Sequence, residues 1–287
     1  MVTHNFKNLK VVLYTSALFS ISSSIFAAGV SADPGDYKAL PAGTNLAVAY
    51  YQHLTADDVY SNNNKVVDDL GLTLDLGMLR YVRYMEIGGL LMDPQIVLPF
   101  AKQQNSLDSS ENSGIGDLLV GGVAWPYHNE ELGRYFALGG FLSIPTGSHK
   151  EDNFAISNDR FQYNFQTGYQ HALNPNIVLE GIAQIELYSD KDKSGMEKET
   201  FYQTDLSAIY KFNSETSLAI TWRRVDGGRE FLGNETMLES EQKNILLLSG
   251  ATNIAKNTQL LLQWRQDFDV KDGAEISGIQ SRLVFAF

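Results

Sequence analysis

From residue 43 to the C-terminus, apolar and polar residues alternate with a period of two rather than 3.6. In residues 161–170 this alternation is nearly complete. One set of positions holds Phe161, Tyr163, Phe165, Thr167 and Tyr169, and the other holds Gln162, Asn164, Gln166, Gly168 and Gln170. A helix of this sequence would have no apolar stripe, whereas a β-strand would have one apolar and one polar face. The pattern therefore predicts strands with one wet face.

The same rule predicts twelve strands, an even number. They lie near 43–55, 67–85, 93–104, 115–127, 134–146, 160–172, 177–189, 199–212, 217–226, 241–253, 257–269 and 276–287. The connections after the even-numbered strands are short, and those after the odd-numbered strands are mostly longer and polar. Short turns on one rim and long loops on the other are typical of outer-membrane barrels. A soluble all-β protein would have shorter strands, of about 5–6 residues.

We therefore expect an all-β fold, a transmembrane antiparallel up-and-down barrel over residues 43–287. After residue 32 no apolar run is long enough for a membrane helix. The other structure that satisfies all backbone hydrogen bonds in lipid is a closed barrel. Residues 33–42 form a short segment that has room to enter the lumen. Aromatic residues near the strand ends are expected to form two interfacial girdles: Tyr50, Tyr51, Trp125, Tyr127, Tyr135, Phe136, Tyr188, Tyr210 and Phe212.

The first 32 residues are typical of a secretory signal peptide. They contain Lys7 and Lys10, no acidic residue, and an apolar or small-residue run from Val11 to Ala28. Cleavage is expected after Ala32 or near Ala28. An uncleaved membrane anchor is the alternative, but hydroxyl residues interrupt the run. These features predict export through the periplasm to the outer membrane of a Gram-negative bacterium.

Charge and composition exclude several function classes. Cleavage after Ala32 leaves 20 basic and 34 acidic residues, a net charge of −14, which argues against nucleic-acid binding. The absence of cysteine excludes a thiolate metal site, and we expect no cofactor. The expected partners are outer-membrane lipid and lipopolysaccharide, small hydrophobic solutes, and the barrel assembly machinery. That machinery would read the last strand, where Leu283, Phe285 and Phe287 share one face.

Five segments form an ordered series along the chain: DPGDYKALPAGTNL from Asp33, LRYVRY from Leu79, DPQIVLPF from Asp93, GDL from Gly116 and FLSIPTGS from Phe141. This series resembles the phenol-degradation meta-pathway outer-membrane transporter family, distantly related to the long-chain fatty acid and toluene uptake channels. The resemblance implies passive entry of small hydrophobic compounds, aromatic ones among them. The fatty acid channels resemble a larger barrel with a substantial N-terminal plug domain. The segment before the first strand is too short here for such a domain.

Charged residues on the wet faces are candidates for the lumen and for solute selectivity: Asp75, Arg80, Arg83, Asp117, Glu180, Glu186, Asp205, Arg223, Arg265 and Arg282. Their structural alternative is a network of satisfied ion pairs. Arg80 shares a face with the row from Leu70 to Met78, which would place it toward lipid at a cost of about 2–4 kcal/mol. We therefore expect a β-bulge near Gly77–Arg80 that turns Arg80 inward.

Pro99 lies inside a predicted strand and has no N–H group for the ladder. One interpretation is a bulge or an early strand end. The functional hypothesis is a break in the wall through which an apolar solute leaves sideways into lipid, as the resemblance to the fatty acid channels implies.

Two further patterns are weaker. The run from Asp190 to Gly195 begins like a calcium loop, but position twelve is Phe201 instead of a bidentate glutamate, so an ordinary extracellular loop is expected. Catalysis is not expected, because no serine and histidine are predicted to meet.

Two functions stay open. The first is a passive channel for small hydrophobic compounds, and the second is a structural or adhesive barrel that acts through its surface loops. A passage as wide as a benzene ring would favour the channel, whereas a lumen crowded by charged or aromatic side chains would favour the second function. A general polar porin is disfavoured, because twelve strands enclose less space than the 16–18 strands of an aqueous pore.

Overall fold

The computed structural model describes residues 31–287 except 107–109, 149–156 and 190–194. The regular structure in these ranges consists of β-strands. Within them, no helix is long and apolar enough to span a membrane.

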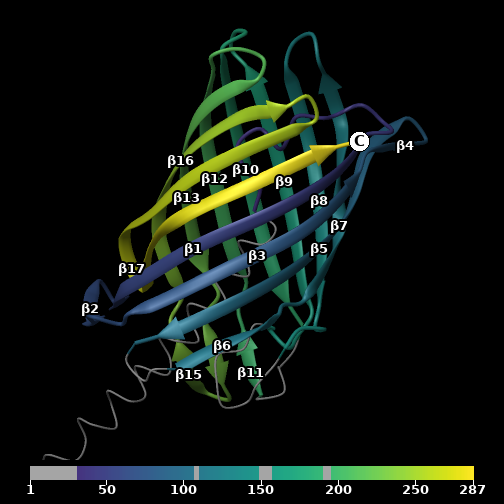
Figure 1. Cartoon of the computed structure of the whole chain (residues 1–287). Coiled ribbons are helices and arrows are strands. Elements are labelled where there is room, and N and C mark those ends of the chain that lie inside the picture. The colour runs from purple at the N-terminus through teal and green to yellow at the C-terminus, as the bar shows by residue number, and fades with distance from the viewer. Residues whose placement is uncertain (1–30, 107–109, 149–156, 190–194) are drawn as a thin grey trace, which may run out of the picture.

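Eleven antiparallel strands form a closed ring (Figure 1). Strands that follow one another around the ring also follow one another along the chain, and the last strand pairs with the first. They are β1 (Asn45–Ser61), β3 (Leu72–Arg83), β5 (Leu90–Asn105), β7 (Leu118–Asn129), β8 (Arg134–Ile144), β9 (Gln162–Ala172), β10 (Ile177–Tyr188), β12 (Phe201–Lys211), β13 (Thr216–Gly227), β16 (Glu241–Ala255) and β17 (Thr258–Ala286). The expected up-and-down barrel is confirmed.

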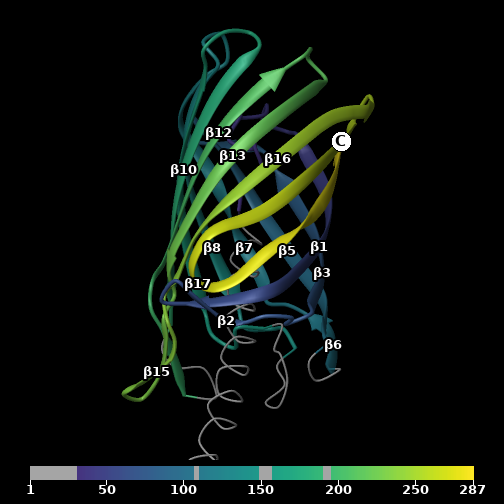
Figure 2. The same cartoon turned by 90° about the vertical axis from the view of Figure 1, so that its left-hand side faces the viewer.

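Strand β17 crosses the wall twice, because the chain reverses within it (Figure 2). Its first half pairs with β16 as far as Asp272, and its second half pairs with β1 from Gly273. The amide of Ala286 donates to the carbonyl oxygen of Asn257 at 2.9 Å, so both ends of β17 lie at one rim. Asp269 and Gly273 have positive φ angles of 49° and 106° at the reversal. The ring therefore has twelve passes, as the alternation predicts.

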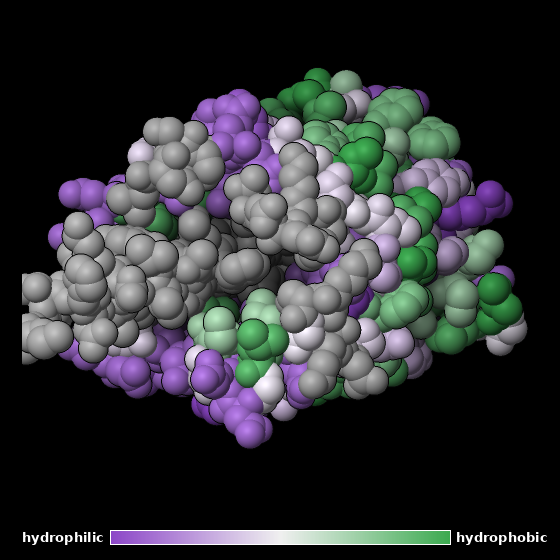
Figure 3. All heavy atoms as spheres, turned by 90° about the horizontal axis from the view of Figure 1, so that it is seen from below, coloured by the Kyte–Doolittle hydropathy of each residue, from purple (hydrophilic) through white to green (hydrophobic). Residues whose placement is uncertain are grey.

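The two rims differ as expected. One rim carries the C-terminus and the short strand β4 (Met85–Ile87). It also carries the short turns that follow β7, β9, β12 and β16. The opposite rim carries extra strands that the sequence did not reveal. They are β2 (Asn64–Val67), β6 (Ser110–Ile115) and a three-stranded sheet of β11 (Met196–Lys198), β14 (Glu230–Leu232) and β15 (Glu235–Leu238). Seen from this long-loop rim, hydrophilic residues gather on the left and hydrophobic residues on the right-hand flank (Figure 3).

The outside of the barrel is apolar and the inside is largely polar. In β9, for example, Phe165 is 51% exposed on the outer face, whereas its neighbour Gln166 is 6% exposed in the lumen. The exposed face carries large apolar side chains on every strand of the ring, which suits contact with lipid. Phe285 and Phe287 lie on this face beside each other at the C-terminus, with ring centroids 5.8 Å apart.

The expected bulge near Gly77–Arg80 is wrong. The pairing of β3 with both β1 and β5 continues through this region without a register shift. Arg80 therefore faces inward together with the whole row of Leu72, Leu74, Leu76 and Met78, all buried. The alternation correctly grouped these residues on one face, but apolarity alone did not identify which face meets lipid.

The expected girdles are correct only in part. Tyr51, Tyr127, Phe136, Tyr210 and Phe212 are exposed on the outer face. In contrast, Tyr50, Trp125, Tyr135 and Tyr188 point inward. The hydroxyl of a tyrosine and the indole N–H of a tryptophan can also find hydrogen-bond partners inside a polar lumen. The hydroxyl of Tyr188, for example, donates to Glu186 at 2.8 Å.

Replacing Leu206, which is 53% exposed at the centre of the outward face of β12, tests this assignment of faces. Leu206→Lys is expected to lower the free energy of unfolding by about 2–4 kcal/mol, because a charge would face the bilayer midplane. The measurement is denaturant unfolding of the protein in lipid vesicles. Asn234→Lys, in the exposed turn between β14 and β15, is the control and should change stability little. Equal effects of the two variants would contradict the outward placement of Leu206.

Candidate functional site: the lumen and its vestibule

The segment that precedes β1 enters the lumen and is held there by charged side chains. Arg282 on β17 donates to the carboxylate of Asp33 at 2.9 Å and to that of Asp36 at 2.7 Å. The backbone amide of Gly35 donates to Glu180 on β10 at 3.1 Å. These contacts join the segment to opposite parts of the wall, because β10 and β17 are separated by three strands of the ring.

Tyr37 fixes the same segment by polar contacts and by packing. Its side chain is 2% exposed, and its hydroxyl donates to Gln166 at 2.9 Å. The indole N–H of Trp125 donates to the carbonyl oxygen of Tyr37 at 3.0 Å, and the indole stacks on Tyr84. The Tyr37 ring occupies the space beside Gly168, where a Cβ atom would lie 2.3 Å from the ring. A glycine at this position is therefore needed for the tyrosine to fit.

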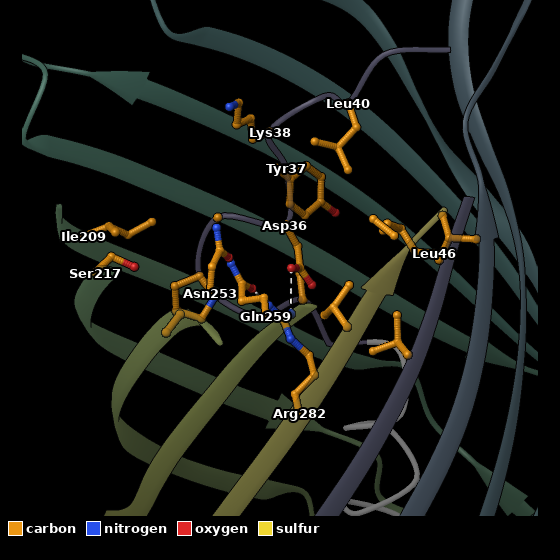
Figure 4. Close-up of a pocket in the computed structure, with 18 of the residues that line it drawn as sticks. Asp36, Tyr37, Lys38, Leu40, Leu46, Ile209, Ser217, Asn253, Gln259 and Arg282 are labelled. Atoms are coloured by element: carbon orange, nitrogen blue, oxygen red, sulfur yellow. Dashed lines mark hydrogen bonds and ion pairs between the residues drawn. The ribbon is translucent and has the colours of Figure 1, made fainter. Parts of the chain in front are cut away.

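A cavity of about 470 Å³ lies between this segment and the short-turn rim (Figure 4). We call it the vestibule. Apolar side chains, among them Leu46, Ile209 and Val284, line it together with polar side chains of the turns. Figure 4 shows Tyr37 and Leu40 on the segment that crosses the cavity and Asp36 facing Arg282. Its volume lies within the roughly 300–1,000 Å³ of small-molecule sites.

The lumen narrows where Asp33 and Arg282 meet. Beyond them lies a cavity of only about 30 Å³, lined by Asp33, Gln52, Arg223 and Arg265 among others. Measured in the same way, about 10–15 Å³ is enough to hold one water molecule, so this cavity has room for only a few. In the described part of the chain, the vestibule therefore leads to a constriction that is too narrow for an aromatic ring.

Ion pairs and amide groups fill the lumen further from the vestibule. Arg223 donates to both oxygens of Asp205, at 2.8 and 2.7 Å. Asp267, which is completely buried, accepts from Arg265 at 2.8 Å and from Lys243 at 2.8 Å. Each charge has an opposite partner, as burial requires. A second cluster surrounds the buried Glu186, which accepts hydrogen bonds from Gln162, Asn164, Gln184 and Tyr188.

The structure places most of the candidate lumen residues inside the barrel. Seven of the ten face the lumen: Arg80, Glu180, Glu186, Asp205, Arg223, Arg265 and Arg282. Only Arg80 and Arg282 among them line the vestibule. The remaining lumen residues take part mainly in the polar contacts described above.

Asp75 and Arg83 do not face the lumen, which corrects the expectation for both. The carboxylate of Asp75 lies on the outer face of β3, where it accepts from Tyr51 at 2.6 Å and contacts His53 Nδ1 at 2.8 Å. Arg83 is exposed on the same outer face, at the short-turn rim. Both are odd-numbered residues of β3, and its unbroken register places the even-numbered residues inside. Tyr51 and His53 are the polar partners of Asp75, whereas Arg83 is exposed at the rim.

Asp117 lies between β6 and β7, outside both strands, and organises a loop. Its carboxylate accepts from the amides of Gly147 and Asn158 and from the hydroxyl of Ser157, at 3.0, 2.9 and 2.5 Å. Burial raises the pKa of the Asp117 carboxyl, while these hydrogen bonds favour its charged form. The residue therefore supports the wall and lines neither cavity.

Pro99 lies at an irregularity of the same wall. Pairing of β5 with β7 ends at Val97, and pairing with β6 begins at Phe100. The carbonyl oxygen of Pro99 accepts from the amide of Gly116 at 2.8 Å. Because both backbone groups of a residue in an antiparallel strand point to the same neighbour, the missing N–H of Pro99 also faces this junction. The ladder is thus interrupted at Pro99, and the loop held by Asp117 lies beside the interruption.

Three charged residues of the lumen were not among the candidate residues. Asp33 and Asp36 pair with Arg282 beside the vestibule, and Lys243 pairs with Asp267 further along the lumen. The available signal was that a segment with two acidic residues preceded strands whose wet faces carried arginines. Residues 190–194 of the loop that begins like a calcium site lie outside the described residues. Within the described residues, no group of three or more His, Asp or Glu side chains could hold a metal ion.

Comparison with known proteins gives the fold and the family. Residues 55–283 match the family described as "Putative MetA-pathway of phenol degradation". The chain belongs to this family. The COG4313 outer-membrane channel from Pseudomonas putida F1 is similar in structure, with a TM-score of 0.85 and 28% identity, covering 90% of this chain and all of that one.

More distant structures share the barrel fold alone. The transport unit of the autotransporter AIDA-I from Escherichia coli has a TM-score of 0.55 at 10% identity, covering 95% of this chain and 99% of that one. The TodX monoaromatic hydrocarbon channel, as its deltaS2 mutant, has a TM-score of 0.51 at 9% identity, covering 91% of this chain and 93% of that one. No curated protein sequence matches the chain. The fold and the family are therefore those of outer-membrane barrels.

Proposed function

We propose that this chain is a passive outer-membrane channel for small hydrophobic compounds, aromatic ones among them. The observation that carries the proposal is its similarity, over the whole of that chain, to an outer-membrane channel of the same fold. The family, described by phenol degradation, favours aromatic solutes. The vestibule is large enough for such a solute, and part of its wall is apolar. Since the lumen is constricted at Asp33 and Arg282, transport requires the segment of residues 33–42 to move.

The crowded lumen favours a second function, a structural or adhesive barrel that acts through its long loops. Its ion pairs and the narrow cavity beyond Asp33 would suit a barrel that carries nothing. The vestibule is the feature that this alternative leaves without a role. Catalysis is not proposed, since the similar structures include channels and transport units.

The location and processing follow from the same proposal. Residues 1–32 would act as a signal peptide, removed after Ala32 or near Ala28, and residues 43–287 would form the membrane domain. The exposed face of Phe285 and Phe287 would be read by the barrel assembly machinery, and the long loops would meet lipopolysaccharide. Protease treatment of whole cells should then cut within 56–66, 147–159 or 227–240. Cuts confined to the short turns would show that the opposite rim faces the outside of the cell.

Uptake by cells is the test of the channel. Small apolar molecules cross phospholipid quickly, so a porin-deficient Gram-negative host, whose outer membrane is the barrier, is preferable to simple vesicles. Cells that express the barrel should accumulate labelled aromatic and aliphatic compounds faster than cells without it, with a preference among the compounds. No difference from barrel-free cells, with the protein inserted in the membrane, would refute the proposal and leave the adhesive function.

Pro99→Val tests whether solutes leave through the wall. The new N–H would face the junction with Gly116 and could extend the ladder there. If solutes exit at this interruption, uptake of apolar compounds should fall several-fold, while the amount of inserted barrel stays the same. Heat-modified mobility on gels would report folding of the variant. Unchanged uptake by a normally inserted variant would remove the lateral exit.

A further inference from the structure

The vestibule lining holds more cations than acids, in contrast to the whole chain, and one of these cations, Arg282, is paired with Asp33 and Asp36. Five cationic and three acidic side chains line it, whereas the whole chain has 22 basic and 34 acidic residues. The cationic residues are Lys38, Arg80, Lys211, Lys256 and Arg282, and the acidic ones are Asp36, Asp93 and Glu215. Basic residues therefore outnumber acidic ones in the lining of the vestibule, whereas acidic residues outnumber basic ones in the whole chain.

Arg80 is a cation of the vestibule wall that no carboxylate in the described ranges contacts directly, and Asp93 is linked to it through the side chain of Gln95. Its Nε donates to the side-chain oxygen of Gln95 at 2.8 Å, and its Nη1 donates to the hydroxyl of Tyr50 at 3.2 Å. Both partners are neutral. Within the described residues, no carboxylate oxygen lies within 4.0 Å of an Arg80 nitrogen, whereas Arg282 has two carboxylates. A guanidinium with neutral partners in a cavity can accept a further anion, and the second face of its fork fits a carboxylate.

The mouth of the vestibule adds cations at the short-turn rim. Lys38 is on the inserted segment, Lys211 is at the end of β12, and Lys256 is in the turn between β16 and β17. In the described residues, none of the three forms an ion pair with an acid. Lys38 and Lys211 lie close enough for their charges to repel each other. An entering anion would relieve this repulsion.

Part of the vestibule wall near Arg80 is apolar, and amide side chains such as Gln95 and Gln170 line the rest. Val48 and Val82 lie next to Arg80 on the inner faces of β1 and β3, and Val123 on β7 and Phe141 on β8 line the same cavity. A ligand that fits this arrangement has an apolar ring for the walls and one acidic group for Arg80. We propose that the vestibule binds aromatic carboxylates, with Arg80 as the residue that recognises the carboxylate group. This inference rests on the proposed function, because it names the solute class of that channel.

Equilibrium binding tests the inference without transport. Calorimetry on the detergent-solubilised full barrel would compare benzoate with benzamide, which lacks the charge, and with acetate, which lacks the ring. Benzoate should bind at least about tenfold more tightly than either. Arg80→Gln should weaken benzoate binding about tenfold and change benzamide binding less than about twofold, and Arg80→Lys should retain part of the preference.

Arg83→Gln is the matched control. It removes the same charge from the same strand, three residues away on the outer face, and should leave benzoate binding unchanged. If Arg80→Gln does not fold, the double variant Lys38→Gln/Lys211→Gln at the accessible mouth should weaken benzoate binding several-fold. Equal binding of benzoate and benzamide to the unmodified barrel, or an unchanged preference in the folded variants, would overturn the inference. Failure of uptake with intact benzoate binding would instead refute the proposed channel.

Discussion

Replacing Asp33 and Asp36 together with asparagine is expected to raise the uptake of uncharged aromatic compounds at least about tenfold, a change in barrier of about 1.4 kcal/mol. The two carboxylates are the acids that pair with Arg282 and hold the segment across the lumen. Asparagine preserves their size but removes the charge, so the segment can leave the constriction more often. The measurement is uptake by porin-deficient cells, normalised to the amount of inserted barrel.

Lys38→Gln is the control for this variant. Lys38 lies on the same segment but forms no ion pair with the wall among the described residues, so its replacement should leave the uptake of uncharged compounds unchanged. Because Asp33 follows the expected cleavage site, mass spectrometry of the N-terminus should confirm that all variants are processed alike. Unchanged uptake by a correctly processed D33N/D36N barrel would show that the segment does not limit passage.

The second large effect concerns stability. Asp267→Asn is expected to lower the free energy of unfolding by about 3–5 kcal/mol, because it leaves the buried cations of Lys243 and Arg265 without their shared carboxylate. Uptake by the folded fraction should be unchanged, since Asp267 lines neither cavity. The measurement is denaturant unfolding in lipid vesicles, together with uptake per inserted barrel.

Asp226→Asn is the comparison within the same barrel. Its carboxylate, 48% exposed, lies 3.6 Å from Arg224 on the outer side of the rim, and exposed ion pairs contribute about 0–1 kcal/mol. A similar small loss for Asp267→Asn would contradict the interpretation of this cluster as a structural one. A large change in uptake would instead assign the cluster to solute passage.

The alternation of residues predicted the strands well because it is a local property. The segment from Gln162 to Ala172 forms β9 within two residues of its predicted bounds, since each residue there meets either lipid or the lumen. The short strands at the long-loop rim were not predicted, because four of them, such as β14, have only three or four residues and the fifth, β6, has six. The alternation of apolar and polar residues is a weak signal in strands that do not separate lipid from the lumen.

The orientation of β3 was harder, and the reason is physical. Its inner face is apolar from Leu72 to Met78, so the rule that apolar residues meet lipid gave the wrong side. That rule produced the bulge that does not exist and placed Asp75 in the lumen. Only the register with β1 and β5 distinguishes the two faces. Such pairing between distant strands cannot be read from one strand alone.

The candidate site was only partly predictable, because it is formed by contacts between segments that are distant in the sequence. Arg282 and Asp33, which meet at the constriction, are 249 residues apart in the sequence. Charge and periodicity predicted that Arg282 faces the lumen, but not that a short preceding segment would supply its partners. The Tyr37 ring beside Gly168 is a similar case, because a glycine in a strand indicates a close approach without naming what approaches.

Whether the N-terminal segment closes a channel can be measured by comparing three kinds of cells side by side in the uptake of labelled toluene. Cells with the unmodified barrel are expected to take up toluene faster than barrel-free cells, and cells with the D33N/D36N barrel are expected to be the fastest. Equal uptake by all three, with both proteins inserted in the outer membrane, would contradict a channel closed by its N-terminal segment.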